Sequence, residues 1–512
     1  MNKRIKIITV FVLVFNFVNA QNYDVAPMQP TSADMAFDGE QDYFPLGVWM
    51  QQTSKVEDYK AIGINNYTAL WEGLTAQKEA DLKAAGMPLI VDPVGYIHST
   101  GETNDYALTL SEEDRKFIKA WLSPTDEPDN PKKNPETGKY DIYVSPDSTY
   151  AMYEHIKEIT NDGKPVYLGI GRGVSDINWV GRGANTGKWE MYAEETYGYV
   201  TESGSWINDE STPAIGFCKG GDIVHYDIYP ANYMDRKLEW VPKGVDSLVS
   251  WSKPGKPIFV AIEASQIKDE YGEPTPSEIR TEIWMSIIHG ARGVVYFSHS
   301  WVGGTTNEDA LLDNTEIANG IKDINAEITS LASVINSPNE SFVQAKLVYN
   351  PDFYGTIDYV CKSFEDDHYV FAVEMSNKKK KVEFFVPSGV TSVEVINEDR
   401  TIEVVDGKFK DTFEAYDTHL YKLLPSGVNL SENDKVIERN IEIYPNPTTG
   451  QVYVGEDTSD NVNKIEVYSM QGQLIKVVSN QDNIDLSFAR NQMLLLKIYS
   501  NKGVKTAKVS VK

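Results

Sequence analysis

Short apolar runs alternate with helical patterns between residues 41 and 338. Eight such runs lie at 46–49, 65–71, 87–92, 117–123, 165–171, 222–230, 257–263 and 293–299. Helical patterns separate or follow them at 56–62, 75–85, 145–160, 276–288 and 315–335. Parallel strands that are buried on both faces read as continuous apolar runs. This order therefore predicts a closed (β/α)8 barrel, or TIM barrel, over residues 41–338.

The pattern changes after the barrel. Alternating apolar and polar positions occur at 345–349, 369–374, 381–386 and 391–395, with no helical pattern between them. They predict a small antiparallel β-sandwich over residues 340–424. Residues 425–439 are polar and are predicted to form a linker. Residues 440–512 carry strand patterns again, which predicts a second small all-β domain.

Residues 1–20 have the pattern of a signal peptide. Lys3, Arg4 and Lys6 precede an apolar run over 7–18, and Ala20 is a small residue at the expected cleavage point. The run is too short to cross a membrane, so the chain is predicted to be secreted and to have no transmembrane segment. Residues 21–40 are polar and are expected to form a leader before the barrel.

Length and charge narrow the possible functions. A chain of 512 residues is too long for one hydrophobic core, which agrees with several domains. The formal net charge of -27 argues against a nucleic-acid partner, because such proteins concentrate lysine and arginine. Cys218 and Cys361 are the only cysteines and are expected to be small buried residues, not a disulfide framework.

Two acidic positions stand where a barrel carries its chemistry. Asp126-Glu127-Pro128 follows the fourth apolar run, and Glu263 ends the seventh. Cleavage of a glycosidic bond needs a proton donor and a second carboxylate, so we predict Glu127 as acid/base and Glu263 as nucleophile. Asp126 is a further catalytic candidate, which either holds a sugar hydroxyl or is itself the acid. Taken alone, Asp-Glu-Pro also suits a helix N-terminus and Glu263 a salt-bridged strand residue; their joint placement favours catalysis.

Aromatic and polar residues near the same strand ends predict a carbohydrate groove, because flat rings stack on sugars and polar groups bind hydroxyls. The predicted substrate-binding residues are Trp49, Trp71, Asp92, Arg172, Arg182, His225, Asp227, Tyr229, His299 and Trp301. For Asp227, support of a loop and a direct catalytic role both stay open. The histidines lack ligand spacing, and the Gly169–Gly173 run lacks dinucleotide spacing, so neither a metal nor another cofactor is expected.

The fourth strand resembles that of the large clan of retaining barrel glycosidases, where the strand ends in Asn-Glu-Pro; here Asp126 replaces the Asn. Residues 41–336 further resemble secreted bacterial endo-1,3-fucanases, in the segments 46–49, 120–130, 222–230, 262–263 and 282–293. This resemblance implies endo-cleavage of a sulfated fucan. Arg172, Arg182 and Lys188 lie in the long loop after the fifth run, where they either bind sulfate oxygens or make hydrogen bonds that stabilise the loop. The alternatives are a neutral β-glycan hydrolase (β-glucanase or β-galactanase), a non-catalytic glycan-binding barrel, and an adhesin that binds through residues 340–424.

The C-terminal segment contains Pro445-Asn446-Pro447, followed by Gly450 and a later Tyr468–Gly472 strand turn. It resembles the sorting domain of the type IX secretion system. The resemblance implies a β-sandwich fold for residues 440–512, export through the type IX machinery, and a location outside the cell or on the outer-membrane surface.

Overall fold

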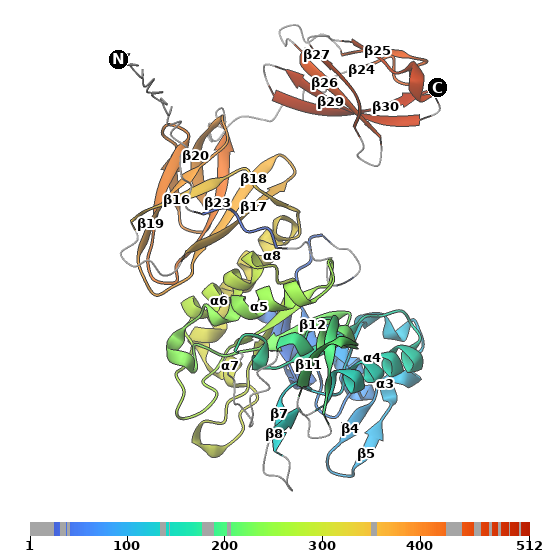
Figure 1. The fold of residues 1–512 in the computed structure, drawn as a ribbon, viewed down its shortest axis with the longest axis vertical. Helices are drawn as coiled ribbons and strands as arrows, with labels where there is room; N and C mark the ends of the chain where they lie inside the picture. The colour runs from blue at the N-terminus through green and yellow to red at the C-terminus, as the bar shows by residue number, and fades with distance from the viewer. Residues whose placement is uncertain are drawn as a thin grey trace, which may run out of the picture. The chain divides into compact units, whose positions relative to one another are not determined.

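The fold was analysed in a computed structural model of the chain (Figure 1). The structure describes residues 25–30, 37, 41–133, 140–142, 144–176, 189–201, 206–349, 356–425, 443–454, 462–469, 474–479, 483–490, 492–500 and 503–512. The predicted signal peptide, most of the predicted leader, and the linker at 426–439 lie outside these residues. The chain divides into two compact units, Met1–Val428 and Asn429–Lys512.

The first unit contains a closed parallel barrel in the order β1-β14-β13-β12-β9-β6-β3-β2. Its strands are β1 (Leu46–Trp49), β2 (Asn66–Thr68), β3 (Leu89–Val91), β6 (Ile118–Leu122), β9 (Val166–Ile170), β12 (Ile223–Asp227), β13 (Ile258–Glu263) and β14 (Gly293–Phe297). Each predicted apolar run supplies one strand. The ring closes where β1 pairs with β14, in the register Leu46 to Val294. The predicted (β/α)8 fold is therefore confirmed.

Helices form where the sequence predicts them, at α1 (Val56–Ala61), α2 (Ala76–Ala85), α4 (Pro146–Thr160), α6 (Pro276–Ile288) and α8 (Thr315–Ile335). Local signals fix their ends: Thr275 and Glu278 form a capping box before α6. The helix α5 (Trp240–Trp251) was not predicted, because Pro242 and Gly244 interrupt its pattern. Gly244 is needed there, since a Cβ would lie 2.2 Å from the ring of Tyr226.

Alternation along the strands places every second side chain inside the barrel. Tyr167, Ile223, Phe259 and Val295 pack there as a separate apolar cluster. Gly293 leaves room for the Phe259 ring, because a Cβ at position 293 would lie 2.4 Å from it. This part of the barrel is therefore a filled core, as is usual for this fold.

Three hairpins extend from the carboxyl ends of neighbouring strands. β4 (Gly95–Ile97) and β5 (Glu102–Asn104) follow β3; β7 (Pro131–Lys133) and β8 (Tyr140–Ile142) follow β6; β10 (Glu195–Val200) and β11 (Trp206–Ile215) follow β9. None of the three was predicted. Because they follow barrel strands, they enlarge the rim at which a barrel carries its active site.

An antiparallel sandwich follows the barrel in the same unit. One sheet has the order β15-β17-β18-β23-β20-β21 and the other β16-β19-β22. The strands are β15 (Asn339–Glu340), β16 (Gln344–Tyr349), β17 (Ile357–Phe364), β18 (Asp367–Glu374), β19 (Lys380–Phe385), β20 (Val390–Val395), β21 (Arg400–Glu403), β22 (Lys408–Phe413) and β23 (Thr418–Pro425). This confirms the predicted sandwich. Cys218 and Cys361 are both buried and unbonded, as predicted.

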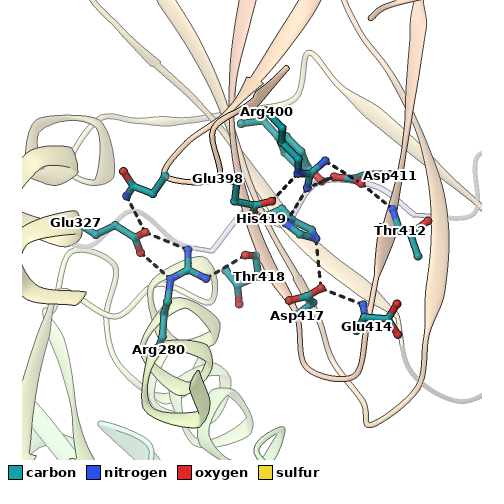
Figure 2. A network of polar contacts seen from close by, with 12 residues as sticks. Arg280, Glu327, Glu398, Arg400, Asp411, Thr412, Glu414, Asp417, Thr418 and His419 are labelled. Carbon is teal, nitrogen blue, oxygen red and sulfur yellow. Dashed lines mark hydrogen bonds and ion pairs between the residues drawn. The ribbon is translucent and has the colours of Figure 1, made fainter. Parts of the chain in front are cut away.

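Polar contacts join the barrel helices to the sandwich (Figure 2). Arg280 of α6 makes a two-pronged pair with Glu327 of α8, at 3.0 and 3.1 Å, and donates to the backbone oxygen of Thr418 at 3.0 Å. Asn397 of the sandwich donates to the same carboxylate at 2.9 Å. Lys362 of β17 is buried and donates to the backbone oxygens of Ile335, the last residue of α8, and of Ser337 just beyond it. These bonds satisfy the buried Glu327 carboxylate and the buried Lys362 amino group only while both parts are in place.

The second unit has two small sheets around its own apolar core, in the orders β24-β25-β28 and β27-β26-β29-β30. Its strands are β24 (Ile443–Tyr444), β25 (Gln451–Val454), β26 (Val462–Ser469), β27 (Leu474–Ser479), β28 (Asn483–Asp485), β29 (Gln492–Ser500) and β30 (Gly503–Val511). The predicted C-terminal β-sandwich is thereby confirmed. Within the ranges described above, no helix combines the length and the apolar character that a membrane span requires.

Candidate active site

A cavity of about 470 Å³ opens at the carboxyl ends of the barrel strands. Its walls come from six of the eight strands or the loops that follow them. The lining residues are Trp49, Asp126, Glu127, Asn130, Ile170, Arg172, His225, Asp227, Tyr229, Tyr233, Ala261, Ile267, Lys268, Tyr271, Phe297 and Trp301. Acidic groups on one side and aromatic rings on several others give the mixture expected of a carbohydrate site.

Glu127 is held in one position by its backbone and by two neighbours. Its φ of 45° lies in the left-handed region, which a non-glycine residue adopts only where the surroundings enforce it. The Asn130 side chain donates to Glu127 Oε2 at 2.5 Å, and the Asn130 backbone N–H donates to the Glu127 backbone oxygen at 3.0 Å. Gly171 lies so close that a Cβ would be 2.7 Å from Glu127 Oε1. The carboxyl group is therefore preorganised.

The surroundings favour the protonated form of the Glu127 carboxyl. Burial is the main cause that raises its pKa well above the usual range, and the negative charges of Asp227 and Asp126 and a hydrogen bond to Asp227 raise it further. A carboxyl group that retains its proton near neutral pH, next to ionisable carboxylates, has the property required of a general acid.

Two further aspartates support this group. Asp129 accepts hydrogen bonds from the Gly171 N–H and the Tyr192 hydroxyl, both at 2.8 Å, and so ties the loop after β6 to the loop after β9. Burial raises the pKa of Asp129 to about 6. Asp92 is not among the lining residues; burial, followed by the charge of Asp126, raises its pKa to about 7. Asp129 was not predicted, although it belongs to the same acidic run.

The two predicted histidines are neutral. His225 lines the cavity between Trp49 and Tyr167, with ring centroids 5.6 and 5.3 Å away, and burial lowers its pKa to about 3. His299 lies beside Phe297, 5.2 Å between centroids, and burial also lowers its pKa. In the described ranges, no group of three or more His, Cys, Asp or Glu side chains is arranged to hold a metal ion.

The predicted role of Glu263 as nucleophile does not agree with its position. Its side chain is fully buried and is not among the residues that line the cavity. Glu263 Oε1 accepts from the Ala231 N–H at 2.6 Å, and Oε2 accepts from the N–H and the side-chain amide of Asn232 at 2.7 and 2.5 Å. These donors belong to the loop that follows β12, so both oxygens of the Glu263 carboxylate are hydrogen-bonded to that loop. Glu263 therefore holds that loop and does not line the cavity.

The other predicted binding residues divide into three groups. Trp49, His225, Asp227, Tyr229, Trp301 and Arg172 line the cavity, as predicted. Arg172 pairs with Asp176 at 3.0 Å and lies 4.8 Å over the Tyr233 ring. Asp92, His299 and Trp71 do not line it, and Arg182 and Lys188 lie outside the described residues.

Sequence reasoning missed several lining residues, among them Asn130, Tyr233, Lys268 and Tyr271. All four lie in loops, where no periodic pattern marks a direction. Tyr233 had a weak signal, since it follows Tyr229 by four residues in the same aromatic segment. The glycines at 169 and 171 were noted in the sequence only for their lack of dinucleotide spacing, but they make room for His225 and Glu127.

Comparison with known proteins identifies the C-terminal segment. Residues 442–512 match the family model of the secretion system C-terminal sorting domain. This match confirms the predicted sorting domain, and such a domain directs export to the cell surface or beyond. No curated protein matches the chain.

Solved structures resemble the chain only distantly. An α-amylase from Anoxybacillus is 10% identical over 75% of this chain and 98% of its own, with a TM-score of 0.42. α-Galactosidase I from Mortierella vinacea is 11% identical over 76% and 98%, with a TM-score of 0.40. A GH30 endoxylanase from Clostridium papyrosolvens is 11% identical over 78% and 98%, with a TM-score of 0.37. The fold assignment therefore rests on the strand order of the barrel itself.

Proposed function

We propose that the barrel hydrolyses glycosidic bonds in a polysaccharide outside the cell. One observation carries this proposal: Glu127, whose surroundings favour its protonated form, meets Asp227 and Asp126 in a cavity with aromatic walls. Glycoside hydrolysis needs a proton for the leaving oxygen and a second carboxylate at the same bond. The sorting domain agrees with an extracellular substrate that is too large to enter the cell.

In this proposal Glu127 donates the proton to the leaving oxygen, and Asp227 is the second carboxylate. Asp227 comes from β12 and Glu127 from the loop after β6, and a hydrogen bond joins the two carboxyl groups, so both can act at the same bond of a sugar. Asp126 is next to Glu127 in the chain and approaches from the same side, which suits a bond to a sugar hydroxyl. Burial and the two neighbouring charges would keep Glu127 protonated until the leaving oxygen takes the proton.

Glu127→Gln and Asp227→Asn, purified as full-length chains, test the assignment in a reducing-sugar assay on a panel of polysaccharides. We expect each variant to lose about 10²- to 10⁴-fold in kcat, the usual contribution of general acid–base catalysis. Glu112→Gln is the matched control, because Glu112 is exposed in the loop before β6. Undiminished cleavage by Glu127→Gln would end the proposal.

The substrate stays a proposal of the sequence resemblance: a sulfated fucan, cut in an endo manner with retention of configuration. Lys268 supports an anionic sugar, because it is a cation in the cavity wall. Proton NMR of the first product distinguishes retention from inversion. In retaining enzymes the two carboxyl groups lie about 5 to 5.5 Å apart, and in inverting enzymes about 6.5 to 9.5 Å.

A neutral β-glycan is the second candidate. It is favoured by the three acidic side chains of the cavity and by the pairing of Arg172 with Asp176, both of which disfavour sulfate. Cleavage of only sulfated or only neutral members of the panel decides between the two. Retardation in gels without new reducing ends would instead indicate a glycan-binding barrel.

A further inference from the structure

We propose a second sugar-binding site outside the cavity, formed by Trp71, Tyr96 and His98 and called here the aromatic platform. It rests on the proposed function and adds that the polysaccharide chain continues from the cavity across one particular side of the barrel rim. The ligand class is a sugar ring without a charged substituent.

The platform lies on the side of the rim that the cavity leaves out. Of the described residues, those that line the cavity come from β1, β6, β9, β12, β13, β14 and the loops after them, and none comes from β2 or β3. Trp71 lies three residues after β2, and Tyr96 and His98 belong to the hairpin segment after β3. Because β2 pairs with β1, whose last residue Trp49 lines the cavity, the platform continues the same rim.

The rings are stacked yet exposed. The Trp71 indole stacks on the His98 imidazole with centroids 4.8 Å apart and planes at 19°. Tyr96 meets His98 edge-on at 5.1 Å. Trp71 and Tyr96 remain 54% and 53% exposed, which is uncommon for such large apolar side chains. One indole face is covered by His98, so the remaining exposed surface is a flat face on a fixed support.

The backbone under the platform is locked. Ala69, Glu72 and Gly73 have φ values of 66°, 57° and 77°, and conformations of this kind persist at non-glycine residues only where contacts enforce them. The Asn104 side chain donates to the backbone oxygens of Glu72 and Leu74, both at 2.8 Å. These contacts prevent the loop from folding Trp71 inward.

The β4–β5 hairpin is fixed to the same loop. The His98 N–H donates to the Glu72 carboxylate at 3.0 Å. Gly95 packs so closely that a Cβ would lie 2.6 Å from the Glu72 backbone oxygen. Both ring-bearing segments are thus positioned before a ligand arrives, which reduces the entropy lost on binding.

The chemistry of the surroundings selects the occupant. An exposed indole face stacks on the C–H face of a sugar ring or on a nucleic-acid base. The carboxylates of the half-buried Glu72 and the exposed Glu102 and the net charge of -27 oppose a polyanion. The Lys78 ammonium, which donates to the backbone oxygens of Trp71 and Gly73, offsets only one of these two carboxylates. An uncharged sugar ring of the substrate chain is therefore the occupant.

Trp71→Ala tests the site, with Trp71→Phe as the conservative variant and Tyr453→Ala, an exposed tyrosine of the second unit, as the control. A sulfated fucan, laminarin and a galactan serve as probes, each as the polymer and as short oligosaccharides. On the polymer that the wild type cuts, we expect Trp71→Ala to raise KM about 3- to 10-fold with kcat nearly unchanged, and Trp71→Phe to recover part of the loss. The shortest cleaved oligosaccharide should show no change.

Gel retardation by the same polymers, in the Glu127→Gln background, measures binding without turnover. Wild-type cleavage with an unchanged KM and unchanged retardation for Trp71→Ala overturns the platform and leaves the proposed function intact. If the protein with Glu127 intact releases no reducing ends from any polymer, but retardation depends on Trp71, the proposed function is overturned and the platform stands. Equal effects on polymer and oligosaccharide also overturn the platform, because they place Trp71 at the cleaved bond.

Discussion

Glu263→Gln separates two roles for this carboxylate, nucleophile or positioning residue. In the folded protein both carboxylate oxygens accept hydrogen bonds from N–H donors of Ala231 and Asn232, at 2.5 to 2.7 Å. A glutamine side chain has one oxygen and one NH₂ group, so either orientation turns a donor toward a buried donor. At least one N–H of the loop after β12 is then left unsatisfied.

The expected cost follows from these contacts. A hydrogen bond to a charged group contributes about 1.5–3 kcal/mol, and an unsatisfied buried donor costs about 1–3 kcal/mol. The free energy of unfolding should therefore fall by about 3 to 5 kcal/mol. Burial raises the pKa of Glu263 to about 7 against the hydrogen bonds that lower it, so the wild type loses stability from this group as the pH rises from about 4.3 to 7; the difference from the variant should shrink over that window and stay constant above it.

Activity should respond through the loop and not through the chemical step. Tyr229 and Tyr233 line the cavity from this loop, so we expect KM to rise more than kcat falls. Glu112→Gln is the control, because Glu112 is exposed and makes none of these contacts. Urea unfolding and steady-state kinetics are measured on all three proteins between pH 6 and 8.5.

The nucleophile role gives a different set of results. Glu263→Gln would then unfold at the wild-type urea concentration and lose kcat by several orders of magnitude. Azide would restore turnover to Glu263→Ala with formation of a glycosyl azide. Either result would refute the interpretation of Glu263 as a positioning residue.

Three further variants test other parts of the structure. Burial and then the charge of Asp227 raise the pKa of Glu127, so Asp227→Asn should move the basic limb of the pH profile of its residual kcat/KM to lower pH; an unmoved limb contradicts the pairing. Gly171→Ala should reduce kcat at least about 10-fold with an unchanged urea midpoint, because the added Cβ would lie 2.7 Å from Glu127 Oε1; full activity would show that Glu127 can shift without loss. Burial lowers the pKa of His289, but hydrogen bonds to Asp246 and Asp358 outweigh it and raise the pKa to about 9, so its contribution of about 3 kcal/mol is fully present below about pH 6.5 and is lost as the pH rises through 9. In urea unfolding the wild type should lose stability over that window and His289→Gln should not; parallel pH curves would contradict the assignment.

The sequence predicts the barrel well because its strands are buried on both faces. Each strand is a short apolar run, and such a run can be identified in the sequence without knowledge of the strand that pairs with it. The helix α5 was not predicted because Pro242 and Gly244 interrupt its pattern, and Gly244 is required by the ring of Tyr226 in β12, which is remote in sequence. Local sequence patterns therefore predict regular helices and strands better than a helix that contains a proline or a glycine.

The site is predicted only in part, for a related reason. Asp126, Glu127 and Asp227 were found because they follow recognisable strands. The direction of the Glu263 side chain depends on N–H groups of residues 231 and 232, in a loop whose course no spacing rule gives. Trp71 was expected in the groove but lies on the rim, since the backbone turns at Ala69 and Glu72 carry it outward.

The bonds between the barrel and the sandwich limit how far this protein can be shortened by engineers who want a compact catalyst. Deletion of everything after Asn336 would remove the Asn397 side chain that donates to Glu327 and the Thr418 oxygen that accepts from Arg280. It would also remove Lys362, which donates to the backbone oxygen of the last residue of α8. Such a fragment should aggregate during expression. The smallest soluble version should run through Pro425.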